Sequence, residues 1–381
     1  PGGSWRFANT PDSDPALPAN REWARDILHR VPDSALGNDT VATSTVDEGG
    51  AVAGIVAAGA AAGPGWAGRP AAERAEILHR AGVELARRRG DLIEVAASEL
   101  GKGIDQSDVE VSEAIDFAHY YAEQALRLEA LPGAHFTPVA LTVVTPPWNF
   151  PLAIPFGGTA AALAAGSAVI LKPASAARRC AAVLAECLWE AGVPRDVMQL
   201  VVPGNRGVGE ALVRDERVGR VVLTGSSDTA RLFRSWRPDL ALLAETSGKN
   251  AIVVTPSADL DLAVKDVVAS AFGHAGQKCS AASLVVLVGS ASFSQRFHDQ
   301  LVDAVASLVV DWPTNPQAQM GPLSEVPGEK LMRGFTRLEK GQTWEVRPRQ
   351  LDASGRLWSP GVRAGVRPGS EFHTVEYFGP I

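Results

Sequence analysis

One cysteine, Cys279, lies in a stretch of small residues with the sequence AFGHAGQKCSAA (271–282). An apolar segment with helical periodicity (262–272) precedes it and a β-branched run (284–288) follows, so the pattern predicts a turn between a helix and a strand. Small neighbours leave room for a second molecule to approach the sulfur. A thiol attacks carbon only as its thiolate, and the adjacent Lys278 would favour that charged form. The alternative is that Cys279 is a small core residue, as free cysteines often are.

Further segments carry polar side chains at predicted strand ends and helix starts: TPPWNFP (145–151), LKPAS (171–175), VVPGNRGVG (201–209), LTGSS (223–227) and AETSGKN (244–250). Held between prolines, Asn149 would direct its amide N–H at an incoming oxygen. Lys172 follows a strand, where ligands of parallel sheets bind. The glycine turns would present N–H groups to phosphate. Taken alone, Asn149 and Glu245 would be a turn residue and a solvated acid.

The elements that position these segments alternate between strand and helix. Apolar β-branched runs predict strands at 141–145, 168–172, 198–202, 220–223 and 251–255. Helical patterns fall between them at 157–165, 176–191, 208–214 and 229–237, after helices at 70–89, 91–99 and 109–127. Such alternation indicates βαβ units and a parallel sheet.

Composition narrows the class of protein. The chain has 381 residues, 46% hydrophobic, and a formal net charge of −7, which argues against a general nucleic-acid binder. Its three cysteines form no disulfide framework and fit a reducing cytoplasm, and no Cys/His cluster has zinc spacing. We find no signal peptide, and we expect the Ala/Gly tract at 51–63 to be too short to span a membrane.

In their order and spacing these segments resemble the aldehyde dehydrogenase superfamily, from about residue 46 to the last residue. The spacing of Glu245 and Cys279 matches the family's base and nucleophile, and EYFGPI (376–381) resembles its E-x-F-G-P coenzyme motif. The strings GQKCSA, ETSGKN and EAIDFAHYYA are similar to those of glutamate-semialdehyde (Δ1-pyrroline-5-carboxylate) dehydrogenases. They are most similar to the C-terminal enzyme of bifunctional proline-utilisation flavoproteins.

The resemblance implies a role for each matching residue. Cys279 would attack the aldehyde, Asn149 and the Cys279 backbone N–H would hold the resulting oxyanion, and Glu245 would activate water. NAD would be bound by Lys172 at the adenosine ribose, Ser226 at a phosphate, Glu376 at the nicotinamide ribose and Phe378 at the nicotinamide, with Trp148, Ser175, Gly204 and Gly225 completing the site. Ser280 and Phe150 would contact the substrate. The resemblance implies no metal.

Two features depart from the family pattern. Many NAD-using relatives carry Glu at the position of Ser175, and its carboxylate would repel a 2′-phosphate, so Ser175 leaves NADP open as an alternative. The chain starts at Pro1 without a methionine and stops at Ile381, so we expect a piece of a longer polypeptide. The missing part would complete the substrate-anchoring loop and supply a strand used in oligomerisation. Whether a flavin-containing proline dehydrogenase domain precedes Pro1 stays open.

The expected architecture is an α/β, aldehyde dehydrogenase-like body. It would comprise an N-terminal arm (1–45), a Rossmann-type NAD-binding domain (46–246) and an incomplete catalytic domain (247–381). A short hairpin near 130–143 would pair with a partner subunit of a homo-oligomer. The expected function is NAD-dependent oxidation of L-glutamate γ-semialdehyde. The alternatives are an aldehyde dehydrogenase for succinate semialdehyde or an aliphatic aldehyde, and a non-catalytic structural or interaction module.

Overall fold

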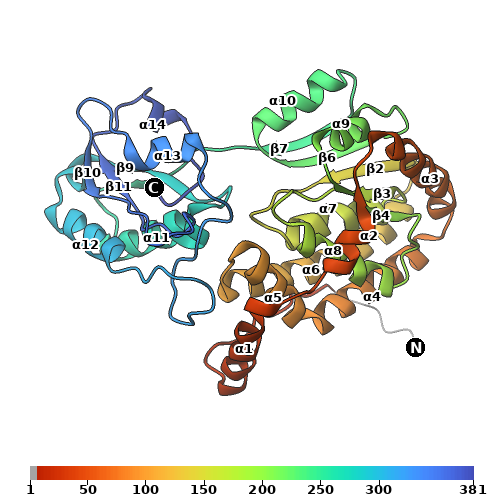
Figure 1. The fold of residues 1–381 in the computed structure, drawn as a ribbon, viewed down its shortest axis with the longest axis horizontal. Coiled ribbons are helices and arrows are strands. Elements are labelled where there is room, and N and C mark those ends of the chain that lie inside the picture. Colours follow the sequence, from red (N-terminus) through yellow and green to blue (C-terminus); the bar gives the residue numbers. More distant parts are fainter. Residues whose placement is uncertain (1–6) are drawn as a thin grey trace. The chain divides into compact units, whose positions relative to one another are not determined.

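The computed structural model describes residues 7–381, which fold as two compact units (Figure 1). The first unit holds residues up to 99 together with 104–246, and the second holds 100–103 together with 247–381. Both units combine helices with parallel strands, which confirms the predicted α/β class. The first unit is therefore discontinuous in sequence, because the four-residue segment Leu100–Gly103 belongs to the second unit.

A five-stranded parallel sheet forms the centre of the first unit, in the order β4-β3-β2-β6-β7. Its strands are β2 (Leu141–Thr145), β3 (Ala168–Leu171), β4 (Met198–Leu200), β6 (Arg220–Gly225) and β7 (Leu242–Thr246). The sequence pattern predicts the first four and misses β7. From β2 the chain moves outward through β3 to β4 and then returns to β6 and β7 on the other side. This reversal creates a switch point at the carboxyl ends of β2 and β6, where open parallel sheets bind ligands.

Helices cover both faces of this sheet, as expected for strands that are buried on both sides. On one face, Leu141 and Val143 of β2 share a core with Val56 of α3 and Val208 of α9. On the other, the backbone of Gly158 in α7 lies close to Val144. The helices of the first unit are α3 (Gly49–Ala67), α4 (Ala71–Arg87), α5 (Arg89–Leu100), α6 (Ile104–Glu129), α7 (Ala153–Ala164), α8 (Arg178–Glu190), α9 (Arg206–Arg214) and α10 (Ser227–Trp236).

The N-terminal segment packs along the first unit through polar contacts. It contains α1 (Pro18–Arg30), α2 (Asn38–Ser44) and β1 (Thr45–Val46), which pairs in parallel with β5 (Val202–Pro203). The Ser13 N–H donates to Asp108 of α6 (2.6 Å), and Arg30 pairs with Glu94 of α5 (2.7 Å). The segment is therefore anchored on α5 and α6.

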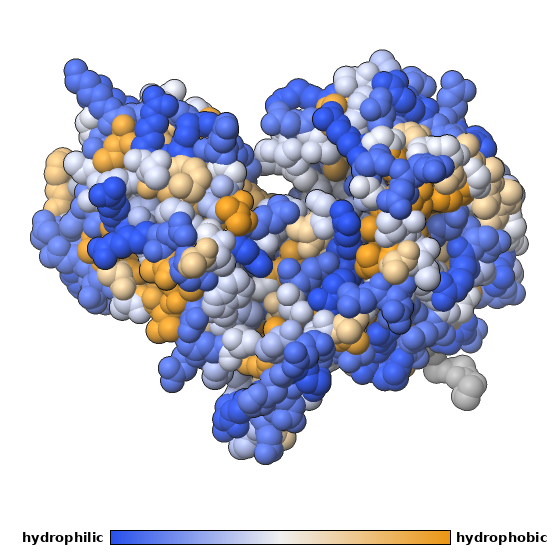
Figure 2. Space-filling model, viewed as in Figure 1, coloured by the Kyte–Doolittle hydropathy of each residue, from blue (hydrophilic) through white to orange (hydrophobic). Residues whose placement is uncertain are grey.

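The Ala/Gly tract at 51–63 lies inside helix α3 (Gly49–Ala67), which extends beyond the tract at both ends. By length and composition alone, α3 could cross a membrane, so the expectation that the tract is too short is wrong. One such helix is weak evidence, because a core helix passes the same test. Val52 and Val56 are buried against the sheet, and the Trp66 indole N–H donates to the Leu163 carbonyl (2.9 Å). Figure 2 shows hydrophobic side chains at the surface over this helix.

The segment near 130–143, where a hairpin is expected, contains no hairpin in the described structure. Residues 131–140 contain no strand, and β2 begins at Leu141 as a central parallel strand between β3 and β6. Pro132 and Pro138 lack the N–H that a ladder requires, which disfavours strand pairing at these two positions. Pairing of this segment with a partner subunit stays a prediction.

Two histidines face each other between α4 and α6. The Nδ1 atoms of His79 and His119 are 2.8 Å apart, and His79 Nε2 lies 3.7 Å from a Glu123 oxygen. Burial lowers the pKa of both rings, and the charge of His79 lowers that of His119 further. The Asp116 carboxylate opposes the shift at His119, and the net direction for both rings is downward, so near pH 6.5 they bind fewer protons in the folded protein than in the unfolded chain.

This pair predicts a loss of stability in mild acid. Because the unfolded chain binds more protons, the free energy of unfolding should fall as the pH drops below about 6.5, by up to about 1.4 kcal/mol per pH unit and group. Equilibrium unfolding of the His119→Gln variant between pH 5 and pH 8 should show a weaker pH dependence than the wild type. His29→Gln, at an exposed position of α1, should keep the wild-type dependence. An unchanged slope in His119→Gln would contradict the assignment.

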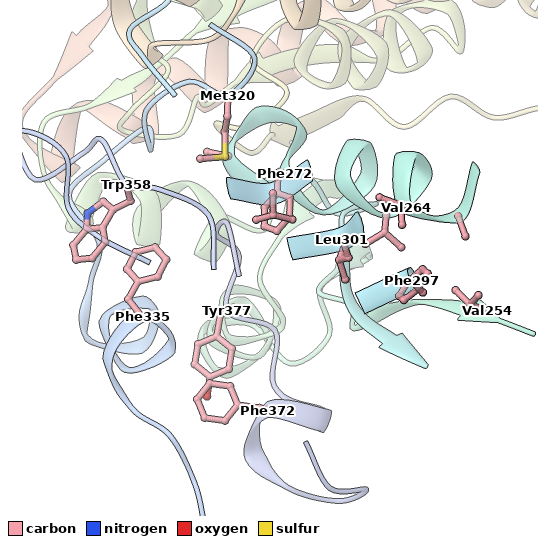
Figure 3. Close-up of a cluster of buried hydrophobic side chains, with 14 of the residues drawn as sticks. Val254, Val264, Phe272, Phe297, Leu301, Met320, Phe335, Trp358, Phe372 and Tyr377 are labelled. Carbon is pink, nitrogen blue, oxygen red and sulfur yellow. The ribbon is translucent and has the colours of Figure 1, made fainter. Parts of the chain in front are cut away.

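The second unit is built around an aromatic core. Phe335 stacks on Trp358 (centroids 4.4 Å apart) and Phe372 stacks on Tyr377 (4.8 Å), as Figure 3 shows. Such pairs add about 0.5–1.5 kcal/mol beyond their buried area. The elements are β8 (Asn250–Val254), α11 (Leu260–Phe272), β9 (Ala282–Leu287), α12 (Gln295–Ala306), α13 (Glu329–Thr336), β10 (Thr343–Val346), β11 (Val362–Ala364) and α14 (Glu371–Thr374). β8 pairs with β9 in parallel, and β10 pairs with β11 antiparallel.

The segment Leu100–Gly103 is fixed in the second unit by side chains that contact its backbone. Arg356 donates to the Leu100 carbonyl (2.9 Å), and a Cβ at Gly101, whose φ is +74°, would collide with Pro322. Only glycine fits this close approach and left-handed backbone.

Candidate active site

Cys279 lies in an exposed turn between the helical segment that ends with Gly273–Gly276 and strand β9. This confirms the predicted position between a helix and a strand. It also excludes the alternative of a buried core cysteine, which instead describes Cys180 and Cys187. Ser280, the predicted substrate contact, is exposed in the same turn.

The backbone before the nucleophile is left-handed over three residues. His274, Ala275 and Gly276 have φ values of 52°, 53° and 65°, which non-glycine residues rarely adopt. A Cβ at Gly276 would collide with the Gly379 carbonyl, so the loop packs directly on the chain's last residues. The buried Gln277 side chain accepts a hydrogen bond from the Ser324 N–H (3.1 Å). These contacts hold a costly local conformation in place.

His274 is buried below this loop as a neutral imidazole. Burial lowers its pKa well below the usual value, and the charges of Lys102 and Lys278 act in the same direction. Its Nε2 has no hydrogen-bond partner among the residues that the structure describes. The ring therefore contributes no positive charge to the nucleophile loop near neutral pH.

The predicted nicotinamide-side residues lie in the same unit as Cys279. The Glu376 carboxylate accepts a hydrogen bond from the Gly248 N–H (3.4 Å), and burial raises its pKa. Lys249 lies over the Tyr377 ring (5.9 Å to the centroid), and burial lowers the pKa of this lysine to about 8. Phe378 has a φ of +59°, so its backbone is also left-handed. Gly379 packs against the loop that carries the nucleophile. Glu376 and Phe378 directly precede Gly379 in the sequence, so the backbone of this segment runs beside that loop.

The remaining predicted residues lie in the first unit, at the carboxyl edge of the sheet. Trp148, Asn149 and Phe150 form a bend that follows β2, and Asn149 is 4% exposed. Lys172 follows β3, and its ammonium donates one hydrogen bond, to the Pro173 carbonyl (3.3 Å). Burial lowers the pKa of Lys172, and the charge of Arg178 lowers it further.

The residues predicted to contact phosphate differ in whether the fold already uses their polar groups. Ser226 follows β6, is exposed, and caps α10 by accepting from the Thr229 N–H (3.1 Å). Gly225 ends β6, and a Cβ there would make ordinary van der Waals contact with the Leu223 side chain, at 3.7 Å. Gly204 instead gives its N–H to the Val46 carbonyl (2.9 Å), and a Cβ there would collide with Asp47. Packing against Asp47 therefore accounts for this glycine, and its N–H is not available to phosphate.

Glu245 is the penultimate residue of β7, where it pairs in register with Thr224 of β6. Its side chain is exposed. Because the strands are parallel, Glu245 lies at the same edge as the segments that follow β2 and β6.

This donor set fits a dinucleotide. Within residues 7–381 the Lys172 ammonium donates to the Pro173 carbonyl alone, which leaves two of its three N–H groups for a ligand. Ser226, beside the switch point, has an exposed hydroxyl that also contacts the Thr229 hydroxyl (3.0 Å). Ammonium and hydroxyl groups at such an edge suit ribose and phosphate oxygens. Among residues 7–381 no group of three His, Cys, Asp or Glu side chains is placed to hold a metal ion.

Comparison with known proteins decides the family. The model of the aldehyde dehydrogenase family matches residues 32–381. The chain belongs to the aldehyde dehydrogenase family. It is 34% identical over 341 residues to a 1-pyrroline-5-carboxylate dehydrogenase of Geobacillus sp. (strain WCH70), which covers 83% of this chain and 65% of that protein.

Solved structures agree with this assignment. Proline Utilization A (PutA) from Corynebacterium freiburgense is 48% identical with a TM-score of 0.90, covering 100% of this chain and 38% of that chain. A 1-pyrroline-5-carboxylate dehydrogenase from Thermus with bound NAD is 28% identical with a TM-score of 0.87, covering 99% and 81%. The predicted aldehyde dehydrogenase-like fold is thus confirmed, and the chain spans just under two thirds of the length of the curated relatives it matches.

Proposed function

We propose that this protein oxidises L-glutamate γ-semialdehyde, the open form of 1-pyrroline-5-carboxylate, to L-glutamate with NAD. The observation that carries the proposal is an exposed Cys279 on a helix-to-strand turn, in a chain 48% identical over its whole length to a proline utilization protein. The name of the Geobacillus relative supports the substrate, and the NAD bound to the Thermus relative supports the coenzyme.

In the proposed reaction the Cys279 thiolate adds to the aldehyde carbon, and the carbonyl oxygen becomes an alkoxide. The Asn149 amide and the Cys279 backbone N–H would stabilise that alkoxide, which is commonly worth several kcal/mol. When bound, NAD accepts the hydride that leaves the same carbon, and the carbon remains as a thioester on Cys279. Glu245 then takes a proton from water, which attacks the thioester to give the carboxylic acid and restore the thiol.

The test is NADH formation followed by absorbance, with glutamate semialdehyde, succinate semialdehyde and an aliphatic aldehyde compared at equal concentrations. A kcat/KM highest for glutamate semialdehyde supports the proposal. Faster turnover of succinate semialdehyde would keep the chemistry and reject the substrate. NAD binding without turnover of any aldehyde would favour a non-catalytic module.

Coenzyme choice gives a further prediction at Ser175. Ser175 is exposed in the segment that follows β3, between Lys172 and Arg178 in the sequence. The charge of Arg178 lowers the pKa of Lys172, so the segment carries two interacting cations. The Ser175→Glu variant should bind NADP at least about 10-fold more weakly, because a carboxylate beside a 2′-phosphate costs more than about 1.4 kcal/mol in a partly buried site. Its affinity for NAD should be retained, as measured by titration of intrinsic fluorescence.

Ser175→Ala provides the matched control, since it removes the hydroxyl without adding charge and should leave the ratio of the two dissociation constants near the wild-type value. Equal weakening of NAD and NADP in the Glu variant would show a steric effect and contradict the electrostatic explanation.

A further inference from the structure

Strands β8 and β9, the second of which follows the nucleophile loop, pair irregularly at their first residues. β8 and β9 pair in parallel, with Asn250 opposite Ala282 and a register shift between Asn250 and Ala251. Beside this shift, the Asn250 side chain adds hydrogen bonds to the turn that precedes β9. Its Nδ2 donates to the Cys279 carbonyl (2.5 Å) and to the Ala281 carbonyl (3.3 Å).

The side-chain chemistry of asparagine suits this position. Its amide nitrogen carries two N–H groups, so one nitrogen can serve both carbonyls. A hydroxyl has one donor and could serve only one of them. Leucine has a similar shape and no donor, so it would leave both carbonyls without this partner.

These bonds bear directly on the geometry of the nucleophile. The Cys279 carbonyl belongs to the peptide plane that joins Cys279 to Ser280, so holding it restricts ψ of Cys279 and thereby the direction of the Cα–Cβ bond that carries the sulfur. The far side of the turn is fixed as well, since the Ala281 N–H donates to the Lys278 carbonyl (3.0 Å) and the Ala282 N–H donates to Ser270 of α11 (3.1 Å).

The segment that carries Asn250 also reaches the coenzyme side. Two residues earlier, the Gly248 N–H donates to Glu376 (3.4 Å), the predicted nicotinamide-ribose ligand. A Cβ at Gly248 would lie 3.9 Å from the Cys279 carbonyl, so this backbone runs beside the nucleophile. One short segment therefore contacts both the reacting cysteine and the carboxylate expected to hold the coenzyme.

We propose that Asn250 is a positioning residue that holds the Cys279 backbone in the orientation required for attack and for hydride transfer. The proposal rests on the proposed function, because it takes Cys279 as the nucleophile. Positioning matters because small displacements of reacting atoms cost rate even when binding is unchanged.

The test compares Asn250→Leu with the wild type in two independent measurements. In steady-state kinetics, kcat should fall about 10-fold to 100-fold with the KM for the coenzyme unchanged. In the second, Cys279 is labelled with bromotrifluoroacetone and observed by ¹⁹F NMR; Cys180 and Cys187 are buried and should not react. The wild type should give one narrow line, and the Leu variant a shifted, broadened or split line.

Asn20→Leu is the matched control, because the Asn20 side chain donates a similar hydrogen bond to the Asp14 carbonyl (2.9 Å). Asn20 is distant from Cys279 in the sequence, so its replacement should change neither measurement. Unchanged kcat and an unchanged line in Asn250→Leu would overturn the proposal, as would a loss of kcat with an unchanged line. A changed line in a protein that turns over no aldehyde would uphold positioning and reject the proposed function. Should the Leu variant fail to fold, Asn250→Ser keeps one donor and is expected to give an intermediate kcat; a wild-type kcat and line in that variant would overturn the proposal.

Discussion

The Cys279→Ala variant is expected to lose NADH formation with every aldehyde that the wild type oxidises, by about 10³-fold or more. No other thiol can replace it. Cys180 and Cys187 are fully buried, and burial raises the pKa of Cys187 to about 12 and that of Cys180 well above the usual value. Neither forms a thiolate at neutral pH, and neither can reach a substrate.

The measurement is initial rate against aldehyde concentration, combined with NAD titration. NAD affinity should remain within about threefold of the wild type, since the predicted coenzyme residues are elsewhere. Cys187→Ala is the control: it should lower the melting temperature through the cavity it leaves and keep the wild-type kcat. Comparable turnover in Cys279→Ala would place the nucleophile at another residue.

The sequence predicts most of the framework because its signals are local. The runs that form β2, β3, β4 and β6 are short, apolar and separated by helical patterns, so periodicity locates them. The turn that displays Cys279 follows from the same reasoning, because a helix and a strand flank a cluster of small residues. Local patterns are therefore enough to place most of the candidate site at the ends of strands.

β7 is missed because its local preferences point elsewhere. Leu242, Ala244 and Glu245 favour helix, and the strand is exposed along much of its length, so no buried apolar run marks it. Pairing with β6 overrides these preferences. The consequence is functional, since the sequence alone leaves Glu245 without an element and the structure places it at the sheet's carboxyl edge.

Other features depend on contacts between distant segments. The place of Leu100–Gly103 in the second unit follows from Arg356 and Pro322, far along the chain. The two acceptors of Asn250 become apparent only once the register of β8 and β9 is known. Gly204 looks like a phosphate-binding glycine in sequence, and only the structure shows Asp47 against it. Spacing identifies the chemistry of a motif but cannot show which backbone groups are already used.

Glu245→Gln is expected to separate the two halves of the proposed reaction. Attack and hydride transfer need the thiolate and the oxyanion donors, whereas release of the acid needs a base to activate water. Steady-state turnover should fall about 10²-fold to 10⁴-fold, the usual range for loss of a general base. A rapid first phase should remain, with one NADH formed per active site, because the thioester still forms and then accumulates.

Stopped-flow absorbance measures both phases, and hydroxylamine supplies the decisive comparison. This strong nucleophile cleaves thioesters without a general base, so it should restore turnover in Glu245→Gln and leave Cys279→Ala inactive. Glu210→Gln, which removes an exposed partner of Arg214 (2.7 Å), should behave as the wild type in both phases. Loss of the first phase in Glu245→Gln, without rescue, would mean that this carboxylate acts earlier, in deprotonating the thiol. The two results thus assign Glu245 either to the water or to the nucleophile.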